Sequence, residues 1–212
     1  MKTNRTLFFV LIANLAALSV VFYFFPKVPL PFIFPSFLDL QLSNLPAIIG
    51  GYALGPIAGS LIVVVRTLIK LPFSQTAYVG ELVDLIIGVS TVVASSLVYK
   101  KVHTKKGAFL GMIAGMVAWT VIAVLANWLF VLDFYIEFFF GGNIDYLLGS
   151  LEVIPGVNES NYMGKYILYA ILPFNLLLSG IVYGFTFVVY KRISELITSL
   201  NERFEKDKKT KE

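Results

Sequence analysis

Four charged side chains lie inside or beside apolar segments, where charges are uncommon. Arg66 and Lys70 are four residues apart near the end of one apolar run, and Glu81 and Asp84 are three apart at the start of the next. Each pair therefore shares one helix face. An ionisable group at membrane depth costs several kcal/mol unless it is paired or faces a cavity. Arg66, Lys70 and Glu81 are therefore candidate substrate-binding residues, and the alternative is a structural ion-pair cluster across the turn at 72–79.

Two asparagines also lie in apolar surroundings. Asn127 is near the end of one long apolar run, and Asn175 is in the last one. An amide carries donors and acceptors, so two amides at similar depth could bind the edge of a heterocycle, although neighbouring backbone groups could equally satisfy them. Pro173 cannot donate a backbone hydrogen bond and frees a carbonyl about one turn before it, which favours a polar site in this apolar wall.

A proline-rich aromatic segment follows the first apolar run. Residues 26–40 read PKVPLPFIFPSFLDL. Proline removes backbone donors and favours extended conformations, so this segment cannot be a spanning helix. Phe32, Phe34 and Phe37 could stack on a planar ligand that the loop covers. The alternative is aromatic anchoring at the membrane interface.

The chain lacks the residues of most catalytic sites. It has no Cys and a single histidine, His103, which leaves out thiolate chemistry and a histidine-rich metal site. Metalloprotease, nucleophile-elbow, phosphate-loop and dinucleotide-binding motifs are also absent from the sequence. We therefore expect no enzyme activity, no cofactor and no metal. Uphill transport would need a partner or an ion gradient, and because acidic residues suited to a proton relay are few, we prefer a partner.

The composition indicates an integral membrane protein. Of the 212 residues, 58% are hydrophobic and 14% charged, and the mean hydropathy is +0.81. The basic residues behind the net charge of +4 crowd beside the apolar runs, which fits membrane orientation better than nucleic-acid binding. We predict an all-α membrane protein with one six-helix domain over 1–195 and a charged cytoplasmic tail over 196–212. The predicted spans are about 7–25, 44–54, 56–71, 81–99, 107–132 and 165–195.

The apolar run at 38–71 decides the topology. As one helix at about 1.5 Å per residue it would be about 50 Å long, well beyond a hydrocarbon core of about 30 Å. Gly55-Pro56 interrupts it, because proline cannot donate the next backbone hydrogen bond and the residue before it is biased away from helix. We therefore predict two short helices, 44–54 and 56–71, that meet at a tight turn. A kinked but continuous helix is the alternative.

The basic residues support the same division. They gather at the N-terminus, in the loop at 100–106 and at the end of the last apolar run. If these three segments are cytoplasmic, six spans place every other loop outside, as the positive-inside rule requires. Five spans would put either the 100–106 loop or the N-terminus on the wrong side. Six transmembrane helices with both termini in the cytoplasm are therefore predicted.

The first span carries a strip of small residues. Ala13 and Ala17 are four apart and share one face of the predicted helix. Such strips favour close helix contact, either within a chain or with a partner. Both uses are open at this point.

Several stretches together resemble one known family. They are PLPFIFPSF from Pro29, DLQLSNLPAIIGGYALGPIAG from Asp39, VGELVDLIIG from Val79, Ala126-Asn127-Trp128, and LPFN from Leu172 with Tyr190-Lys191-Arg192. The pattern resembles the substrate-binding S components of energy-coupling factor (ECF) vitamin transporters, closest to the riboflavin-specific branch. In that resemblance the Ala13/Ala17 strip looks like the family's motif for docking the transmembrane coupling subunit.

The resemblance implies a six-helix protein that captures a vitamin near the outer face and then associates with a transmembrane coupling protein and two ATPase subunits. The first loop and the loops after spans three and five would gate the cavity. At the matching positions, Asn127 and Asn175 would lie at the polar edge of the ligand. Phe32, Phe37 and Leu38 would lie near its ring.

The resemblance leaves the identity of the vitamin open. The chain has Leu178 where riboflavin binders are expected to carry a lysine three residues after the LPFN asparagine, and Arg66 takes the basic position of span three. Riboflavin is the first expectation, with pantothenate or a pyrimidine or pyridoxine precursor as alternatives; Arg66 or Lys70 would suit the carboxylate of pantothenate. From other classes, the alternatives are a membrane scaffold of cell-envelope machinery and a proton-coupled carrier working alone.

Overall fold

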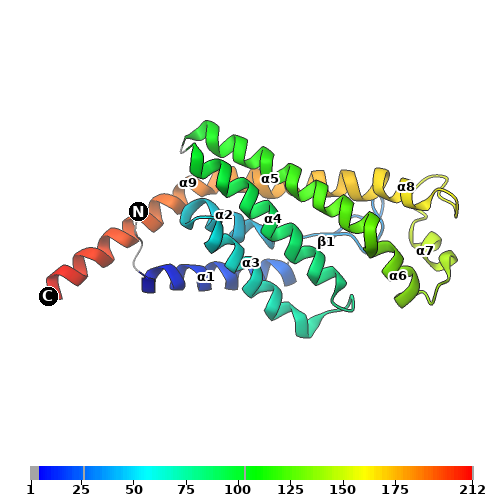
Figure 1. Ribbon diagram of the computed structural model, residues 1–212, viewed down its shortest axis with the longest axis horizontal. Helices are drawn as coiled ribbons and strands as arrows, with labels where there is room; N and C mark the ends of the chain where they lie inside the picture. The colour runs from blue at the N-terminus through cyan, green and yellow to red at the C-terminus, as the bar shows by residue number, and fades with distance from the viewer. Residues whose placement is uncertain (1–4, 26, 103, 212) are drawn as a thin grey trace.

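The long apolar stretches of the sequence form long helices that run along one axis of the molecule (Figure 1). The computed structural model describes residues 5–25, 27–102 and 104–211, so His103 and the first four residues lie outside this part. Within it, five helical segments have the length and hydropathy of membrane spans: Arg5–Phe24, Pro56–Phe73, Val79–Lys101, Lys105–Phe139 and Tyr162–Val189. The prediction of an all-α membrane protein is confirmed.

The break at Gly55-Pro56 is present as predicted. Helix α2 (Asn44–Leu54) ends one residue before Gly55, and α3 (Pro56–Lys70) begins one residue after it. Gly55 has a φ of 101°, which side chains disfavour, and Pro56 opens α3 where its missing N–H is not needed. The continuous-helix alternative is therefore wrong. With 11 residues, α2 is shorter than an ordinary membrane-spanning helix of about 20 residues.

Small residues bring α2 and α3 into close contact. A Cβ atom placed on Gly59 would lie 2.7 Å from the carbonyl oxygen of Ala47 and 2.8 Å from the Cα of Gly51. Only a residue without a side chain fits this approach, as expected where helix backbones meet in a membrane. Both helices also pack against α1 (Arg5–Phe24) and α4 (Val79–Lys101).

Helix ends in the middle of the chain carry residues that commonly stabilise helix termini. α4 has Lys100 and Lys101 in its last turn, where cations stabilise the carbonyl end of the helix dipole. Thr104 caps α5 (Lys105–Ala126), and its hydroxyl accepts a hydrogen bond from the backbone N–H of Gly107 at 3.1 Å. A short 3₁₀ turn, η1 (Leu71–Phe73), follows α3.

The last two spans contain π-helical turns that the sequence prediction did not include. After α5 come the π-turn η2 (Asn127–Val131) and α6 (Leu132–Phe139); after α8 (Tyr162–Tyr166) come the π-turn η3 (Ile167–Ile171) and α9 (Leu172–Lys211). π-turns inside helices are often found at functional sites.

The connecting segments contain more regular structure than predicted. The stretch at 133–164, expected as a loop, includes all but the first residue of α6, the short helix α7 (Ile144–Ser150) and the start of α8. The proline-rich loop forms a small antiparallel pair, β1 (Val28–Pro29) with β2 (Asp39–Leu40). α9 continues to Lys211 rather than ending near 195, because its charged end contains neither glycine nor proline to stop a helix.

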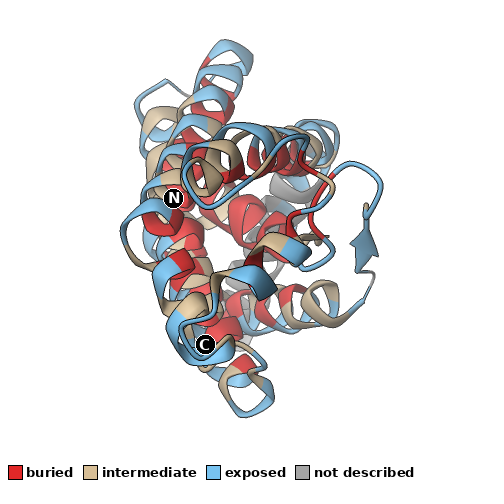
Figure 2. Cartoon of the chain, turned by 90° about the vertical axis from the view of Figure 1, so that its right-hand side faces the viewer, coloured by how far each residue is buried: buried red, intermediate tan, exposed pale blue. Residues whose placement is uncertain are grey.

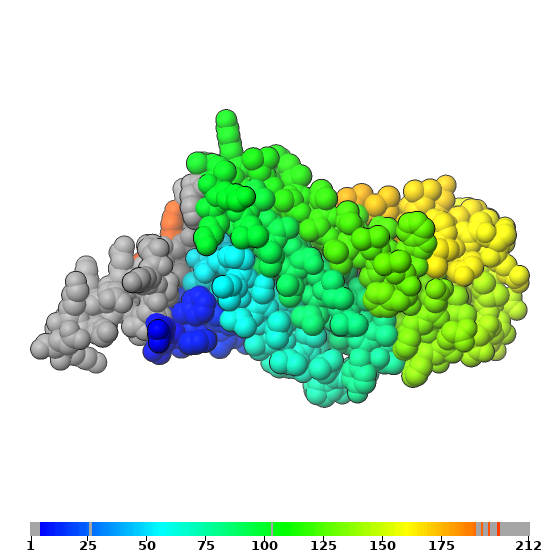
Figure 3. Space-filling model, in the orientation of Figure 1, coloured from blue at the N-terminus to red at the C-terminus, as the bar shows by residue number. Residues whose placement is uncertain are grey.

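The two ends of the molecule differ. Figure 1 shows the start of α1, the α4–α5 turn and the C-terminal part of α9 at one end, and the α3–α4 turn with α6, α7 and α8 at the other. Viewed from the second end, the buried residues face the interior of the bundle (Figure 2). The space-filling view shows residues around α7 and α8 covering this end (Figure 3).

Candidate substrate-binding cavity

A cavity of about 180 Å³ lies between the first loop and helices α2, α4, α5 and α9. The sequence-predicted residues Phe37, Leu38 and Asn175 line it. Its other lining residues come from five segments of the chain: Asp39, Gln41, Ser43, Asn44, Gly80, Val83, Asp84, Ile87, Trp119, Phe174 and Leu178. Aromatic rings and a few convergent polar groups are the usual composition of a small-molecule site.

A larger groove, of about 430 Å³, lies between α3 and α4 on the outside of the bundle. Leu68, Tyr78 and Leu82 line it, and all three are exposed. Exposed apolar side chains on spanning helices face lipid tails. Polar groups converge in the smaller cavity, which is therefore the candidate site.

Asn175 is held in place from two sides. Its Nδ2 donates a hydrogen bond to the carbonyl oxygen of Ile171 at 2.8 Å, and its Oδ1 accepts one from Trp119 Nε1 at 3.0 Å. Ile171 is the last residue of η3, two positions before Pro173. The irregular backbone expected near Pro173 is thus present, and Asn175 binds the carbonyl there.

Asn127 has the same pattern of bonds but does not line the cavity. Its Nδ2 donates to the carbonyl oxygen of Ala123 at 2.8 Å, and its Oδ1 accepts from the hydroxyl of Tyr166 at 3.1 Å. Both amides therefore have backbone partners, which was one of the two interpretations of the sequence. The structure brings only Asn175 to the cavity.

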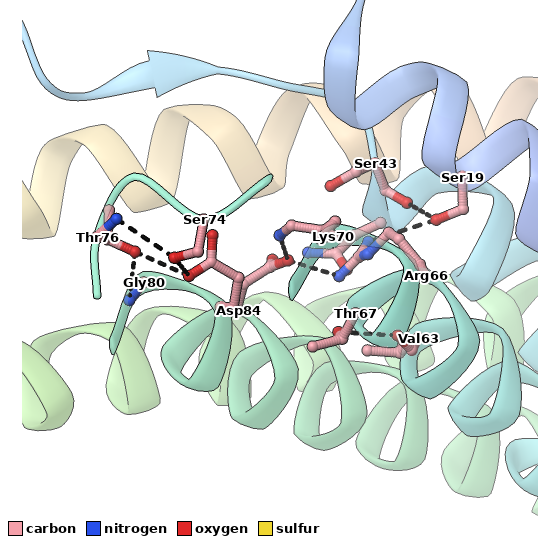
Figure 4. A network of polar contacts seen from close by, with 12 residues as sticks. Ser19, Ser43, Val63, Arg66, Thr67, Lys70, Ser74, Thr76, Gly80 and Asp84 are labelled. Carbon is pink, nitrogen blue, oxygen red and sulfur yellow. Dashed lines mark hydrogen bonds and ion pairs between the residues drawn. The ribbon is translucent and has the colours of Figure 1, made fainter. Parts of the chain in front are cut away.

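The charged residues form a cluster around Asp84 (Figure 4). Oδ2 of Asp84 accepts a hydrogen bond from Arg66 Nη2 at 2.9 Å and another from Lys70 Nζ at 2.7 Å. The side chains of Arg66 and Lys70 are 0% and 2% exposed, and neither lines the cavity. These are the contacts of a structural ion-pair cluster, and both cations are already paired.

Glu81 does not take part in the predicted pairing. Its Oε2 accepts hydrogen bonds from Ser74 Oγ at 2.7 Å and from Thr76 Oγ1 at 2.8 Å. It is buried and fixes the turn between α3 and α4, and it does not line the cavity. Glu81 and Asp84 are three residues apart on α4, yet one faces the turn and the other faces α3.

Arg66 extends the cluster to two more helices. Its Nη1 donates to Asn44 Oδ1 of α2 at 2.9 Å and to Ser19 Oγ of α1 at 3.5 Å. Lys70 Nζ lies 3.6 Å from the centre of the Tyr23 ring, a cation–π distance that links α3 to α1 a second time. The cluster therefore joins α1, α2, α3 and α4 beside the cavity.

Of the three phenylalanines that the sequence prediction named in the first loop, Phe34 and Phe37 turn inward and Phe32 does not. The backbone N–H of Phe34 donates to the carbonyl oxygen of Leu30 at 2.9 Å, a single helical turn that buries the Phe34 ring against Phe174 at 5.3 Å between ring centres. Phe32 lies within this turn, is 94% exposed and does not reach the cavity. Phe37 lines the cavity, with its ring 6.2 Å from that of Tyr166.

Six polar cavity residues were not assigned to the site from the sequence: Asp39, Gln41, Ser43, Asn44, Asp84 and Trp119. Trp119 could have been assigned to a polar site from the sequence, because an indole N–H in the middle of an apolar span needs a hydrogen-bond acceptor. On α1, Ala13 and Ala17 lie on the exposed side of the helix while Ala16 is buried, so the small-residue strip is open to contact with another helix.

Comparison with known proteins agrees with this architecture. The family model described as "ECF transporter, substrate-specific component" matches residues 7–190. The riboflavin transporter RibU of Staphylococcus aureus is 27% identical over 198 residues, 93% of this chain and 94% of that protein. RibU of Leuconostoc mesenteroides is 28% identical over 202 residues, 92% of each chain, and riboflavin transporter FmnP of Bacillus subtilis is 24% identical over 151 residues, 70% of this chain and 72% of that one.

A solved structure of the S component of a bacterial ECF transporter has the same fold. The two chains superpose with a TM-score of 0.68 at 23% identity, over 92% of this chain and 99% of the other. The chain therefore belongs to the family of ECF transporter substrate-specific components, which makes it a multi-pass protein of the cell membrane and a transporter component rather than an enzyme.

Proposed function

We propose that this protein captures riboflavin at the outer side of the membrane and delivers it inward through a transmembrane coupling protein and two ATPase subunits. The similar proteins named as riboflavin transporters support the choice of vitamin. The observation that carries the proposal is the cavity, where the rings of Phe37, Trp119 and Phe174 lie beside the amide of Asn175. Riboflavin has a planar ring with a polar edge, which suits such a lining.

The charges favour riboflavin over pantothenate. A carboxylate ligand needs a free cation, but Arg66 and Lys70 both bind Asp84 and lie outside the cavity lining. Two acidic side chains, Asp39 and Asp84, line the cavity instead. Riboflavin carries a chain of hydroxyl groups and no carboxylate, so it meets no like charge there.

Entry of a flavin requires the first loop to move. The cavity measures about 180 Å³, whereas ligand pockets usually start at about 300 Å³. Phe34 and Phe37 belong to the loop that covers it, and the small β1–β2 pair fastens this loop by few backbone hydrogen bonds. We expect the loop to open and then close over the ring.

Six membrane crossings with both termini in the cytoplasm fit this function. α2 and α3 would form the short second and third crossings, with α2 packed inside protein and away from lipid. The start of α1, the α4–α5 turn and the end of α9 lie at one end of the molecule, in support of one basic, cytoplasmic side. Tags on the two termini should both be accessible only from the cytoplasm, and tags on opposite sides would contradict this topology.

Identification of a copurifying molecule tests the choice of vitamin. Protein purified from cells grown with riboflavin, pantothenate and pyridoxine should carry a yellow ligand with the mass and absorbance of riboflavin. Recovery of pantothenate or a pyridoxine precursor instead would overturn the proposal. A chain purified without its coupling partner should bind the vitamin equally well.

The exposed Ala13/Ala17 strip is proposed as the docking surface for the coupling protein. Replacing both residues with Leu should leave riboflavin binding intact and abolish uptake, because bulky side chains prevent close helix approach. The matched control replaces Val117 and Val121, two exposed residues four apart on α5, with Leu. Normal uptake by the Ala13/Ala17 variant, or equal loss in the control, would contradict the docking role.

A further inference from the structure

One oxygen of Asp84 accepts no hydrogen bond from the residues that the structure describes. Arg66 and Lys70 both bind Oδ2, and within the described part of the chain no hydrogen bond reaches Oδ1. The Asp84 side chain is 16% exposed and lines the cavity, so it keeps an accessible acceptor beside the ligand space. As a carboxylate paired with two cations, it offers acceptors and no donor.

Arg66 fixes two groups of the cavity wall at once. One end of its guanidinium donates to Asp84 and the other to Asn44, and both of these residues line the cavity. A Cβ atom on Gly88 would lie 3.0 Å from Asn44 Oδ1 and 3.3 Å from Arg66 Nη2, so the absence of a side chain at Gly88 leaves space for this arrangement. The planar fork of arginine sets direction as well as distance, which the point charge of lysine cannot do.

We propose that Oδ1 of Asp84 accepts a hydrogen bond from a hydroxyl or ring N–H of the ligand, with Arg66 as the positioning residue that aims the carboxylate. The inference rests on the proposed function, because it concerns the same cavity, and adds the chemical class that the cavity selects. Neutral ligands with a donor group bind. Ligands that bring a carboxylate to this wall are rejected, because two carboxylates repel and have no donor between them.

A comparison of two flavins tests this inference without any mutation. Wild-type protein is titrated with riboflavin and with carboxymethylflavin, which has the same ring but a side chain that ends in a carboxylate. We expect at least tenfold weaker binding of carboxymethylflavin. Equal affinity for the two would overturn the inference while leaving the proposed function intact, whereas no binding of either flavin would overturn the proposed function itself.

Asp84→Asn then assigns the effect to one side chain. Riboflavin affinity should fall at least tenfold, and the preference over carboxymethylflavin should narrow at least threefold. Asp133→Asn, an exposed carboxylate on α6, is the matched control and should change neither value. Lumiflavin, which lacks the hydroxyl chain, identifies the donor group of the ligand. If Asp84→Asn weakens the binding of riboflavin alone, the donor is a hydroxyl. If it weakens the binding of both flavins equally, the donor is a ring N–H. An Asp84→Asn protein that folds and binds riboflavin within twofold of wild type would overturn the inference.

Arg66→Lys tests the positioning role separately. It keeps one positive charge near Asp84 but cannot bind Asp84 and Asn44 as a fork. We expect a several-fold loss of riboflavin affinity in the folded protein, together with a smaller preference over carboxymethylflavin. The thermal midpoint should also fall, because the hydrogen bonds to Asn44 and Ser19 are lost. Unchanged affinity and preference in this variant would remove Arg66 from the positioning role.

Discussion

The indole Nε1 of Trp119 donates a hydrogen bond to Oδ1 of Asn175 at 3.0 Å, and both side chains line the cavity. Asn175 uses one N–H for the carbonyl of Ile171. An amide has two N–H donors and two acceptor positions, so one donor and one acceptor remain for a ligand. Trp119 of α5 thus sets the direction in which an amide of α9 presents these two groups.

Trp119→Phe should weaken riboflavin binding by about 2- to 10-fold, because loss of one hydrogen bond, about 0.5–1.5 kcal/mol, lets the Asn175 amide rotate. Fluorescence titration of riboflavin measures the change. Trp128→Phe is the control, since Trp128 is exposed and lies outside the cavity. Equal affinities of the two variants would contradict the role of Trp119.

Asn175→Ala and Asn127→Ala should act differently. Asn175 lines the cavity, so its removal should cost about 1–3 kcal/mol of binding free energy by leaving a ligand group unpaired. Asn127→Ala leaves the buried hydroxyl of Tyr166 without a partner and should instead lower the free energy of unfolding by about 1–3 kcal/mol. Calorimetric titration and thermal melts in detergent separate the two effects. A larger loss of affinity for Asn127→Ala would show that Asn127 contacts the ligand.

Gly59→Ala should lower stability, because its new Cβ atom would press on the backbone of α2. Overpacking of this kind costs about 1–3 kcal/mol in free energy of unfolding. Gly184→Ala on α9 is the matched control, since nothing lies within 4 Å of its Cβ position. The account predicts a lower thermal midpoint for Gly59→Ala alone, and matching melts would contradict it.

Phe34→Ala should speed the release of riboflavin by about 2- to 10-fold. It removes the ring contact with Phe174 that helps to hold the first loop closed, and an aromatic pair contributes about 0.5–1.5 kcal/mol. Stopped-flow displacement with excess unlabelled ligand measures the rate. Phe25→Ala, an exposed ring just after α1, serves as the control. A release rate unchanged by Phe34→Ala would show that this contact does not hold the loop.

The helix boundaries at Gly55-Pro56 could be predicted because the constraint there is local: proline and glycine restrict the backbone at their own positions. The sequence could not show which of the two acidic residues, Glu81 or Asp84, pairs with Arg66. Both are acidic and share a helix face, and only the rotation of α4 against α3 brings Asp84 to Arg66 and leaves Glu81 at the turn.

The positions of the aromatic residues in the first loop and the π-turns in the long spans could not be predicted from the sequence either. A single helical turn buries Phe34 and leaves Phe32 exposed, and spacing alone does not reveal such a turn in a proline-rich loop. The π-turns at Asn127–Val131 and Ile167–Ile171 lie in stretches with ordinary helical composition, where one extra residue per turn leaves no compositional trace. Asn127 was therefore expected at the cavity but lies beside it.

Direct titration of riboflavin with the purified chain, without coupling protein or ATPases, tests the central claim. Quenching of flavin fluorescence should saturate at one riboflavin per chain, and pantothenate in large excess should not compete. Absence of quenching, together with a thermal midpoint that riboflavin does not raise, would contradict the account.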